Sequence, residues 1–190
     1  QAFAGTLFLA VVTGLVFAKF ARPTARVMWS RKVVIIERDG KRQLQFRMAN
    51  ARANQIVEAQ LRVAFAYTDI TSDGERLRRF FDLRLQRERN ILFALSWTAV
   101  HDISPESPLY DLDFEKMKTM QMQLICSLVG IDETFAQQVH SRHAYLPDDV
   151  VHDKRFADIV GINDDGSRYI DYARFDDLVP MGTRTPGVVN

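Results

Sequence analysis

The sequence has little cysteine, little net charge and no acidic residue before Glu37. Cys126 is the only cysteine among 190 residues, so one chain cannot form an internal disulfide, which is typical of a reducing compartment. The net charge of +1 lacks the strong positive balance of nucleic-acid-binding domains, and we expect no nucleic-acid partner. A Gly-rich nucleotide loop and a nucleophile elbow are both missing. With no catalytic constellation, the sequence predicts neither an enzyme nor a cofactor.

The longest apolar run begins at Phe3 and ends at Phe20. A helix of about 18 residues is about 27 Å long, close to the ~30 Å hydrocarbon core of a bilayer. Basic residues follow the run without an acid between them: Lys19, Arg22, Arg26, Arg31 and Lys32. Because Lys and Arg accumulate on the cytoplasmic flank of membrane spans, we expect one transmembrane helix in the cell inner membrane, with the C-terminal domain cytoplasmic.

Two other interpretations of this run are a cleavable signal peptide and a buried helix. A cleavable signal peptide has its positive charge before the apolar core, whereas here the charge follows it. A buried helix of a soluble domain stays open, because Gly5, Thr6, Thr13 and Gly14 lower the hydropathy. The spanning helix fits the charge pattern best.

Alternation of polar and apolar residues dominates the rest of the chain and predicts β-strands. The alternating segments are residues 43–48, 58–63, 81–86 and 120–124, and residues 33–36 form a β-branched run. Asp39 and Gly40 between two such segments are a strong hairpin pattern. Several short strands separated by turns favour a β-sandwich, with one short helix near residues 113–118.

Six segments resemble, in the same order, the bacterial inward-rectifier potassium channels of the KirBac family. They are residues 14–23, 47–52, 93–98, 107–110, 130–137 and 142–145. The first resembles the end of the inner pore helix of the family, and the second resembles its Arg-x-Ala-Asn-x-Arg strand end. Each motif is weak alone, but together they are specific, and the likeness covers about residues 3–175.

The resemblance implies a mainly β chain, with an immunoglobulin-like cytoplasmic β-sandwich domain preceded by one transmembrane helix. We divide the chain into an inner pore helix (1–22), a membrane-to-cytoplasm linker (23–31), the β-sandwich (32–178) and a loose tail (179–190). The outer helix, pore helix and selectivity filter of the family have no counterpart in this sequence. We expect a fragment that begins at the inner helix, because the chain opens at Gln1 without an initiator Met; a divergent protein without conduction is the alternative.

The resemblance also implies gating residues in the inner helix. Gly5 resembles the family's glycine hinge, and Gly14 a second flexible point, although both glycines also suit plain helix packing. Phe17 resembles the bulky residue at the bundle crossing, where four phenyl rings form a constriction that gates by dewetting. Thr13, one turn earlier, faces the same pore in this reading. The alternative for Phe17 is a side chain that faces lipid.

Basic and acidic residues complete the predicted site. Lys19, Arg22 and Arg26 lie where the family binds anionic lipid headgroups, although the same charges also determine topology. Residues 130–136 resemble the loop around the cytoplasmic pore. In this loop Gly130 permits a tight bend, Asp132 and Glu133 supply a ring of acids, and Phe135 and Ala136 complete it, with an ordinary acidic turn as the alternative. The inner helix has no acid, so we expect weak rectification at most.

No metal site is predicted. His140 and His143 lack a third ligand, and their segment has the pattern of a loop and a strand. Residues 161–166 lack the acid that begins a calcium loop, so a β-hairpin turn is the better interpretation. Cys126 lies in a hydrophobic segment and is predicted to be a core residue.

The sequence therefore favours part of a homotetrameric potassium channel subunit. It would carry potassium passively as the permeant ion, with gating at the bundle crossing and by the cytoplasmic domain, and with modulation by anionic lipid. The alternative is a single-span membrane adaptor or sensor with a β-sandwich binding domain. A central water-filled path between four copies would separate the two.

Overall fold

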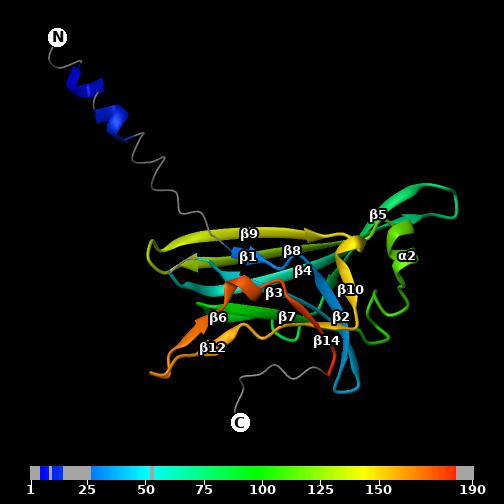
Figure 1. Cartoon of the computed structure of the whole chain (residues 1–190). Helices are drawn as coiled ribbons and strands as arrows, with labels where there is room; N and C mark the ends of the chain where they lie inside the picture. Colours follow the sequence, from blue (N-terminus) through cyan, green and yellow to red (C-terminus); the bar gives the residue numbers. More distant parts are fainter. Residues whose placement is uncertain (1–4, 9, 15–26, 52–53, 183–190) are drawn as a thin grey trace.

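The computed structural model describes residues 5–8, 10–14, 27–51 and 54–182 (Figure 1). Residues 5–8 and 10–14 are helical and exposed. Among the described residues, no helix has both the length and the apolar character needed to cross a membrane. The predicted helix over 1–22 and the predicted tail over 179–190 extend into residues outside this part of the chain.

The first sheet is built around the long strand β3 (Lys41–Asn50). One edge of β3 pairs with β7 (Ser96–Asp102), and its other edge pairs with β1 (Val27–Trp29) and β2 (Val33–Arg38), all antiparallel. Strand β10 (Val150–His152) then adds to β2 in parallel. Asp39 and Gly40 form the predicted turn between β2 and β3, with positive φ angles of 53° and 70°. These angles are typical of a type I′ turn, so the hairpin prediction is confirmed.

The second sheet is built around β4 (Ile56–Ile70) and β8 (Gln123–Asp132), which pair antiparallel. The edge of β4 opposite β8 pairs with β5 (Arg76–Leu83) and β6 (Arg89–Phe93). The other edge of β8 pairs with β9 (Gln137–Tyr145). Figure 1 shows the β8–β9 hairpin turn at the same end of the sheet as β6.

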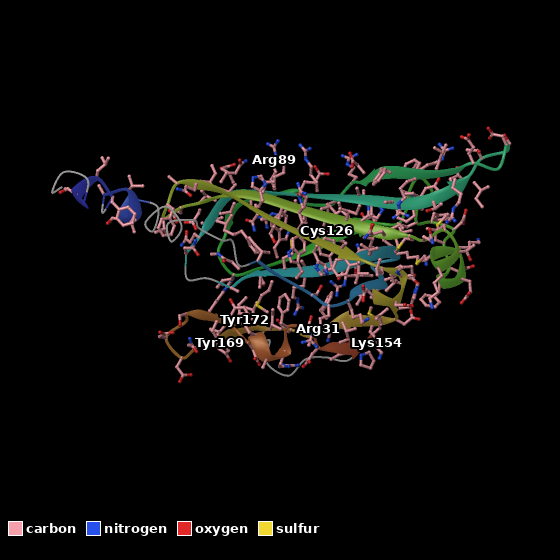
Figure 2. The ribbon with its side chains drawn as sticks, turned by 90° about the horizontal axis from the view of Figure 1, so that it is seen from above. Arg31, Arg89, Cys126, Lys154, Tyr169 and Tyr172 are labelled. Carbon is pink, nitrogen blue, oxygen red and sulfur yellow. The ribbon has the colours of Figure 1, made fainter. Side chains whose placement is uncertain are left out.

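The two sheets pack face to face over one apolar core, which confirms the mainly β prediction. Leu44, Phe46 and Met48 from β3 lie in the same cluster as Leu61 and Phe65 from β4. The cluster also contains Cys126, which is fully buried, as predicted, and which Figure 2 shows in the interior of the sandwich. Burial of these side chains is the main source of stability for the fold.

A third layer, formed by the C-terminal segment, covers the outer side of the first sheet. It contains β11 (Lys154–Phe156), β12 (Val160–Ile162), β13 (Arg168–Ile170) and β14 (Leu178–Pro180), with the short 3-10 helix η2 (Tyr172–Arg174). Another 3-10 helix, η1 (Pro147–Asp149), joins β9 to β10, and its Asp148 forms an ion pair with Lys118. Phe156 packs on Val34 and Ile36, while Phe175 packs on Ala49. Figure 2 shows Tyr169 and Tyr172 in this layer, on the side of the first sheet that faces away from the second.

The predicted short helix is confirmed as α2 (Phe114–Thr119). Asp113 caps it, since its carboxylate accepts a hydrogen bond of 2.8 Å from the backbone N–H of Lys116. Met117 anchors the helix in the main core.

Several element boundaries differ from the sequence prediction. Strand β1 lies inside the segment 23–31 that we expected to be a linker, because its residues pair with the end of β3. Strand β14 crosses the expected boundary at residue 178 because it pairs with β11. The strand predicted over 120–124 was placed too early: Gln121 has a φ of 49° in the turn after α2, and β8 begins at Gln123.

Candidate functional site

The candidate site is the β8–β9 turn, because it contains the predicted pore-loop residues. Asp132 ends β8, and Gln137 opposite it begins β9. One carboxylate oxygen of Asp132 accepts hydrogen bonds from the backbone N–H groups of Thr134 (2.9 Å) and Phe135 (3.2 Å). The other oxygen accepts a hydrogen bond from the side-chain amide of Asn54. Asp132 therefore fixes the shape of the turn.

This geometry corrects the expected role of Asp132. Its side chain is only 1% exposed, and its oxygens are used inside the turn, so in this chain it does not present an exposed negative charge. Glu133 is exposed, and its backbone N–H donates to the carbonyl of Gln55 at 3.0 Å. Glu133 is thus the acid that the turn offers to solvent.

Gly130 is required for close packing and not for a bend. It lies within β8, opposite Val139 of β9. A Cβ atom at this position would lie 2.5 Å from Cγ2 of Ile56 and 3.3 Å from the Cα of Ala59. Strand β4 has a bulge here, where its pairing with β8 shifts between Val57 and Gln60. The bulge brings β4 so near to β8 that only glycine fits without a shift of the neighbouring atoms.

The exposed part of the turn is apolar beside its single acid. Phe135 is 55% exposed and Ile131 is 41% exposed. Ala136 has a φ of 49°, in the left-handed region that side chains other than glycine seldom adopt. The turn therefore presents a phenyl ring and a carboxylate, Glu133, from a rigid base.

Asn50 ties the turn to the other layers. Its side-chain amide donates to the carbonyl oxygens of Asn54 (2.6 Å) and Phe93 (3.3 Å), and its own carbonyl accepts from the Tyr172 hydroxyl at 3.0 Å. Asn54 in turn donates to Asp132. The motif over residues 47–52 thus links the β3–β4 loop, β6, the C-terminal layer and the β8–β9 turn.

Arg47, the first residue of that motif, lies under the C-terminal layer. Its guanidinium donates to the carbonyl of Ala157 at 2.7 Å and lies 4.8 Å from the ring centre of Phe156. Burial lowers the pKa of Arg47 from its ordinary value to about 10, against the opposing effect of Asp158 and Asp176. The residue therefore holds the C-terminal layer as a buried cation.

Strand β1 is attached to the second sheet by aromatic side chains. The indole N–H of Trp29 donates to the Ser141 hydroxyl at 2.9 Å, and the indole stacks on His143. His143 meets Tyr145 edge to face, and the Tyr145 hydroxyl lies 3.2 Å from that of Ser30. Burial raises the pKa of Tyr145 and lowers that of His143. The chain entering the domain is thus joined directly to β9, the strand that leaves the β8–β9 turn.

The other predicted site residues lie in the N-terminal segment. Gly5, Thr13 and Gly14 are exposed and helical. The gate residue and the predicted lipid-binding bases lie outside the described residues; they are Phe17, Lys19, Arg22 and Arg26. Their roles stay predictions.

The described residues contain no group of three or more metal-ligating side chains. His140 and His143 lie three apart on β9 and so point to opposite faces of the sheet. Residues 160–170 form the predicted hairpin, in which β12 pairs with β13. A Cβ at Gly161 would lie 2.2 Å from the Tyr169 ring, which covers this glycine.

Sequence reasoning missed the residues that support the turn. Asn54 and Gln55 precede β4 and bond to the turn, yet neither stands in a pattern that indicates this role. Trp29 was placed in the linker. Its position one residue before the buried Ser30 had no periodicity to indicate a strand.

The model of the inward rectifier potassium channel C-terminal domain matches residues 27–188. The match begins at the first residue of β1 and includes the whole sandwich and the C-terminal layer. The chain belongs to the inward rectifier potassium channel family. Over 178 residues it is 38% identical to the inward rectifier potassium channel Kirbac3.1 of Paramagnetospirillum magnetotacticum, an alignment that covers 94% of this chain and 60% of that protein.

A human relative shows the same likeness at greater distance. The chain is 32% identical over 182 residues to the human G protein-activated inward rectifier potassium channel 1, covering 92% of this chain and 36% of that protein. The rat protein of the same name gives the same identity and coverage. The chain therefore spans little more than half the length of its bacterial relative and about a third of the mammalian ones. The resemblance read from the sequence motifs is confirmed at the level of the family.

Proposed function

We propose that this chain is part of a subunit of a homotetrameric inward-rectifier-type potassium channel. It would be anchored in the cell inner membrane by the helix over 1–22, with the β-sandwich in the cytoplasm. The observation that carries the proposal is the 38% identity to a potassium channel over 94% of this chain. Potassium is the permeant ion, and four copies would surround its path.

The mechanism couples the domain to a gate at Phe17. The linker that follows Phe17 continues into β1, and Trp29 in β1 contacts Ser141 and His143 of β9. Strand β9 leads back to the turn that presents Glu133. Because these contacts join packed elements, a displacement of the linker and a displacement of the turn accompany one another. Opening then consists of separating four Phe17 rings so that water and ions enter the constriction.

Anionic lipid would favour one of the two gate states. Lys19, Arg22 and Arg26 follow the apolar run, and basic residues near a charged leaflet contribute about 1 kcal/mol each. Lipid shifts the equilibrium between the open and closed gate only if these bases bind headgroups more tightly in one state than in the other.

The test is rubidium uptake into liposomes by the full-length gene product, driven by a potassium gradient. We expect flux from the wild type and a higher flux from Phe17→Ala, because alanine removes the hydrophobic constriction. Leu7→Ala, in the same apolar run, is the matched control and should leave flux near that of the wild type. Absence of flux from both wild type and Phe17→Ala, in protein shown to be folded and inserted, would overturn the channel and favour the adaptor.

A further inference from the structure

The outer face of the second sheet carries a row of arginines across its strands. The pairing register places Arg62 of β4 opposite Ser127 of β8, and Ser127 opposite Arg142 of β9. On the other edge of β4, Val63 pairs with Leu83. Arg84 follows Leu83 at the end of β5, next to this row. Because strands lie about 4.8 Å apart, the paired residues from Arg62 to Arg142 extend over about 10 Å.

A second basic row lies next to the first. Gln60 pairs with Arg89 of β6 on one side and with Val129 of β8 on the other, and Val129 pairs with His140 of β9. Two residues along a strand share a face, so Gln60 lies on the same face as Arg62. Figure 2 shows Arg89 on the side of the sheet that points away from the buried Cys126.

These arginines are exposed and are not neutralised. Arg62, Arg84, Arg89 and Arg142 are all exposed, and within the described part of the chain none forms an ion pair with a carboxylate. Three acids lie on or beside this surface. They are Glu58, in the bulge of β4, Asp82, opposite Ala64, and the exposed Glu88, which precedes Arg89. We call the surface formed by Arg62, Arg84, Arg89, Arg142 and His140 the basic face.

Like charges on one face repel one another, and an anion placed among them relieves that repulsion. Arginine recognises phosphate with paired, charge-assisted hydrogen bonds. A single phosphate reaches at most two neighbouring guanidinium groups, whereas a chain of phosphates laid across the strands reaches the whole row. The arginines lie on several neighbouring strands, so a ligand that contacts all of them must be extended.

We propose that the basic face binds a soluble linear polyphosphate of three or more phosphates. The inference rests on the charge and register of this face and does not depend on the channel function. A polyphosphate bound here would join β4, β8 and β9, the strands that carry the bulge at Val57 and the β8–β9 turn, and so stabilise the candidate site.

The test is calorimetric titration of the full chain, held in zwitterionic nanodiscs, with orthophosphate, pyrophosphate and tripolyphosphate. We expect affinity to rise with chain length and to fall steeply as salt is added, because the exposed charges are screened. The double variant Arg62→Gln/Arg142→Gln should lose about tenfold or more in tripolyphosphate affinity. The matched control, Arg38→Gln/Arg168→Gln, removes two exposed arginines outside this face and should bind like the wild type.

Two results would overturn the proposal. One is no tripolyphosphate binding by the wild type, whether or not it binds vesicles with anionic lipid, and the other is equal losses in both double variants. Circular dichroism checks that the variants are folded. If Arg62→Gln/Arg142→Gln does not fold, Arg89→Gln takes its place, with the same loss expected. Failure here leaves the rubidium flux unaffected, so it is distinct from failure of the channel proposal.

Discussion

Trp29 and His143 stack with ring centroids 5.8 Å apart and ring planes inclined by 12°. One residue belongs to the first strand of the first sheet and the other to the last strand of the second. Because Trp29 also donates to Ser141, the entering chain is fixed to β9 at two side chains. The stack is the direct connection between the start of the domain and the strand that leaves the β8–β9 turn.

Acid should loosen this connection. Burial lowers the pKa of His143 below its ordinary value of about 6.5, although Asp149 acts in the opposite direction. The unfolded chain therefore binds more protons than the folded one, and stability falls as the pH decreases from about 6.5 through the lowered pKa. We expect thermal unfolding to show a larger loss of stability between pH 7.5 and pH 5 in the wild type than in His143→Gln.

His140→Gln is the control for this measurement, since His140 is exposed on the opposite face of the same strand. It should keep the acid sensitivity of the wild type. If His143→Gln lost as much stability in acid as the wild type, another group would be responsible.

Removal of the Asp132 carboxylate should destabilise the domain. In Asp132→Ala the N–H groups of Thr134 and Phe135 and the amide of Asn54 lose their acceptor. Loss of a buried charged acceptor costs about 3 kcal/mol of unfolding free energy. Denaturant unfolding measures this cost. Glu133→Ala changes the adjacent exposed acid and should alter stability by about 0.5 kcal/mol or less. Equal effects of the two variants would contradict the anchoring role of Asp132.

Substitution of Gly130 tests the close approach of β4 to β8. In Gly130→Ala the new methyl group would meet Ile56 Cγ2 at 2.5 Å, so either the side chain or the bulge must shift. Overpacking of this kind costs about 1–3 kcal/mol. The double variant Gly130→Ala/Ile56→Ala removes Cγ2, the atom that the new methyl group would meet, so it should lose less stability than the sum of the two single variants in denaturant unfolding. A loss equal to that sum would place the strain against the β4 backbone instead.

The sequence predicted the fold best where structure depends on near neighbours. The Asp39–Gly40 turn requires two residues that adopt positive φ, and the pattern alone identified it. The alternation over 43–48 indicated β3, but it is also typical of a strand with one solvent face. In the structure Gln43, Gln45 and Arg47 are buried, because a layer more than 100 residues later covers that face. The alternation along β3 cannot indicate that the C-terminal layer, distant in the sequence, covers its outer face.

The candidate site shows the same limit. Asp132 and Glu133 are adjacent acids in a predicted turn, and the sequence gives no reason to assign them different roles. Only the positions of Asn54 and of the turn N–H groups separate the buried anchor from the exposed acid. Gly130 was predicted to permit a tight bend, whereas in the structure it permits close packing against a bulge in another strand.

Arg47 should hold the C-terminal layer through its planar guanidinium and not through charge alone. Lysine keeps the positive charge but has no flat group to lie on the Phe156 ring while donating to Ala157. We expect Arg47→Lys to lower the unfolding free energy by about 1–3 kcal/mol.

Hydrogen exchange shows which part of the domain is affected. In Arg47→Lys, amides of β11 and β14 should lose protection before those of β4 and β8, because the layer contacts the first sheet through a few side chains. The control is Arg38→Lys, which changes an exposed arginine of β2. It should leave both the unfolding free energy and the hydrogen-exchange protection unchanged. Equal loss of protection across both sheets in Arg47→Lys would mean that the C-terminal layer unfolds only together with the sandwich.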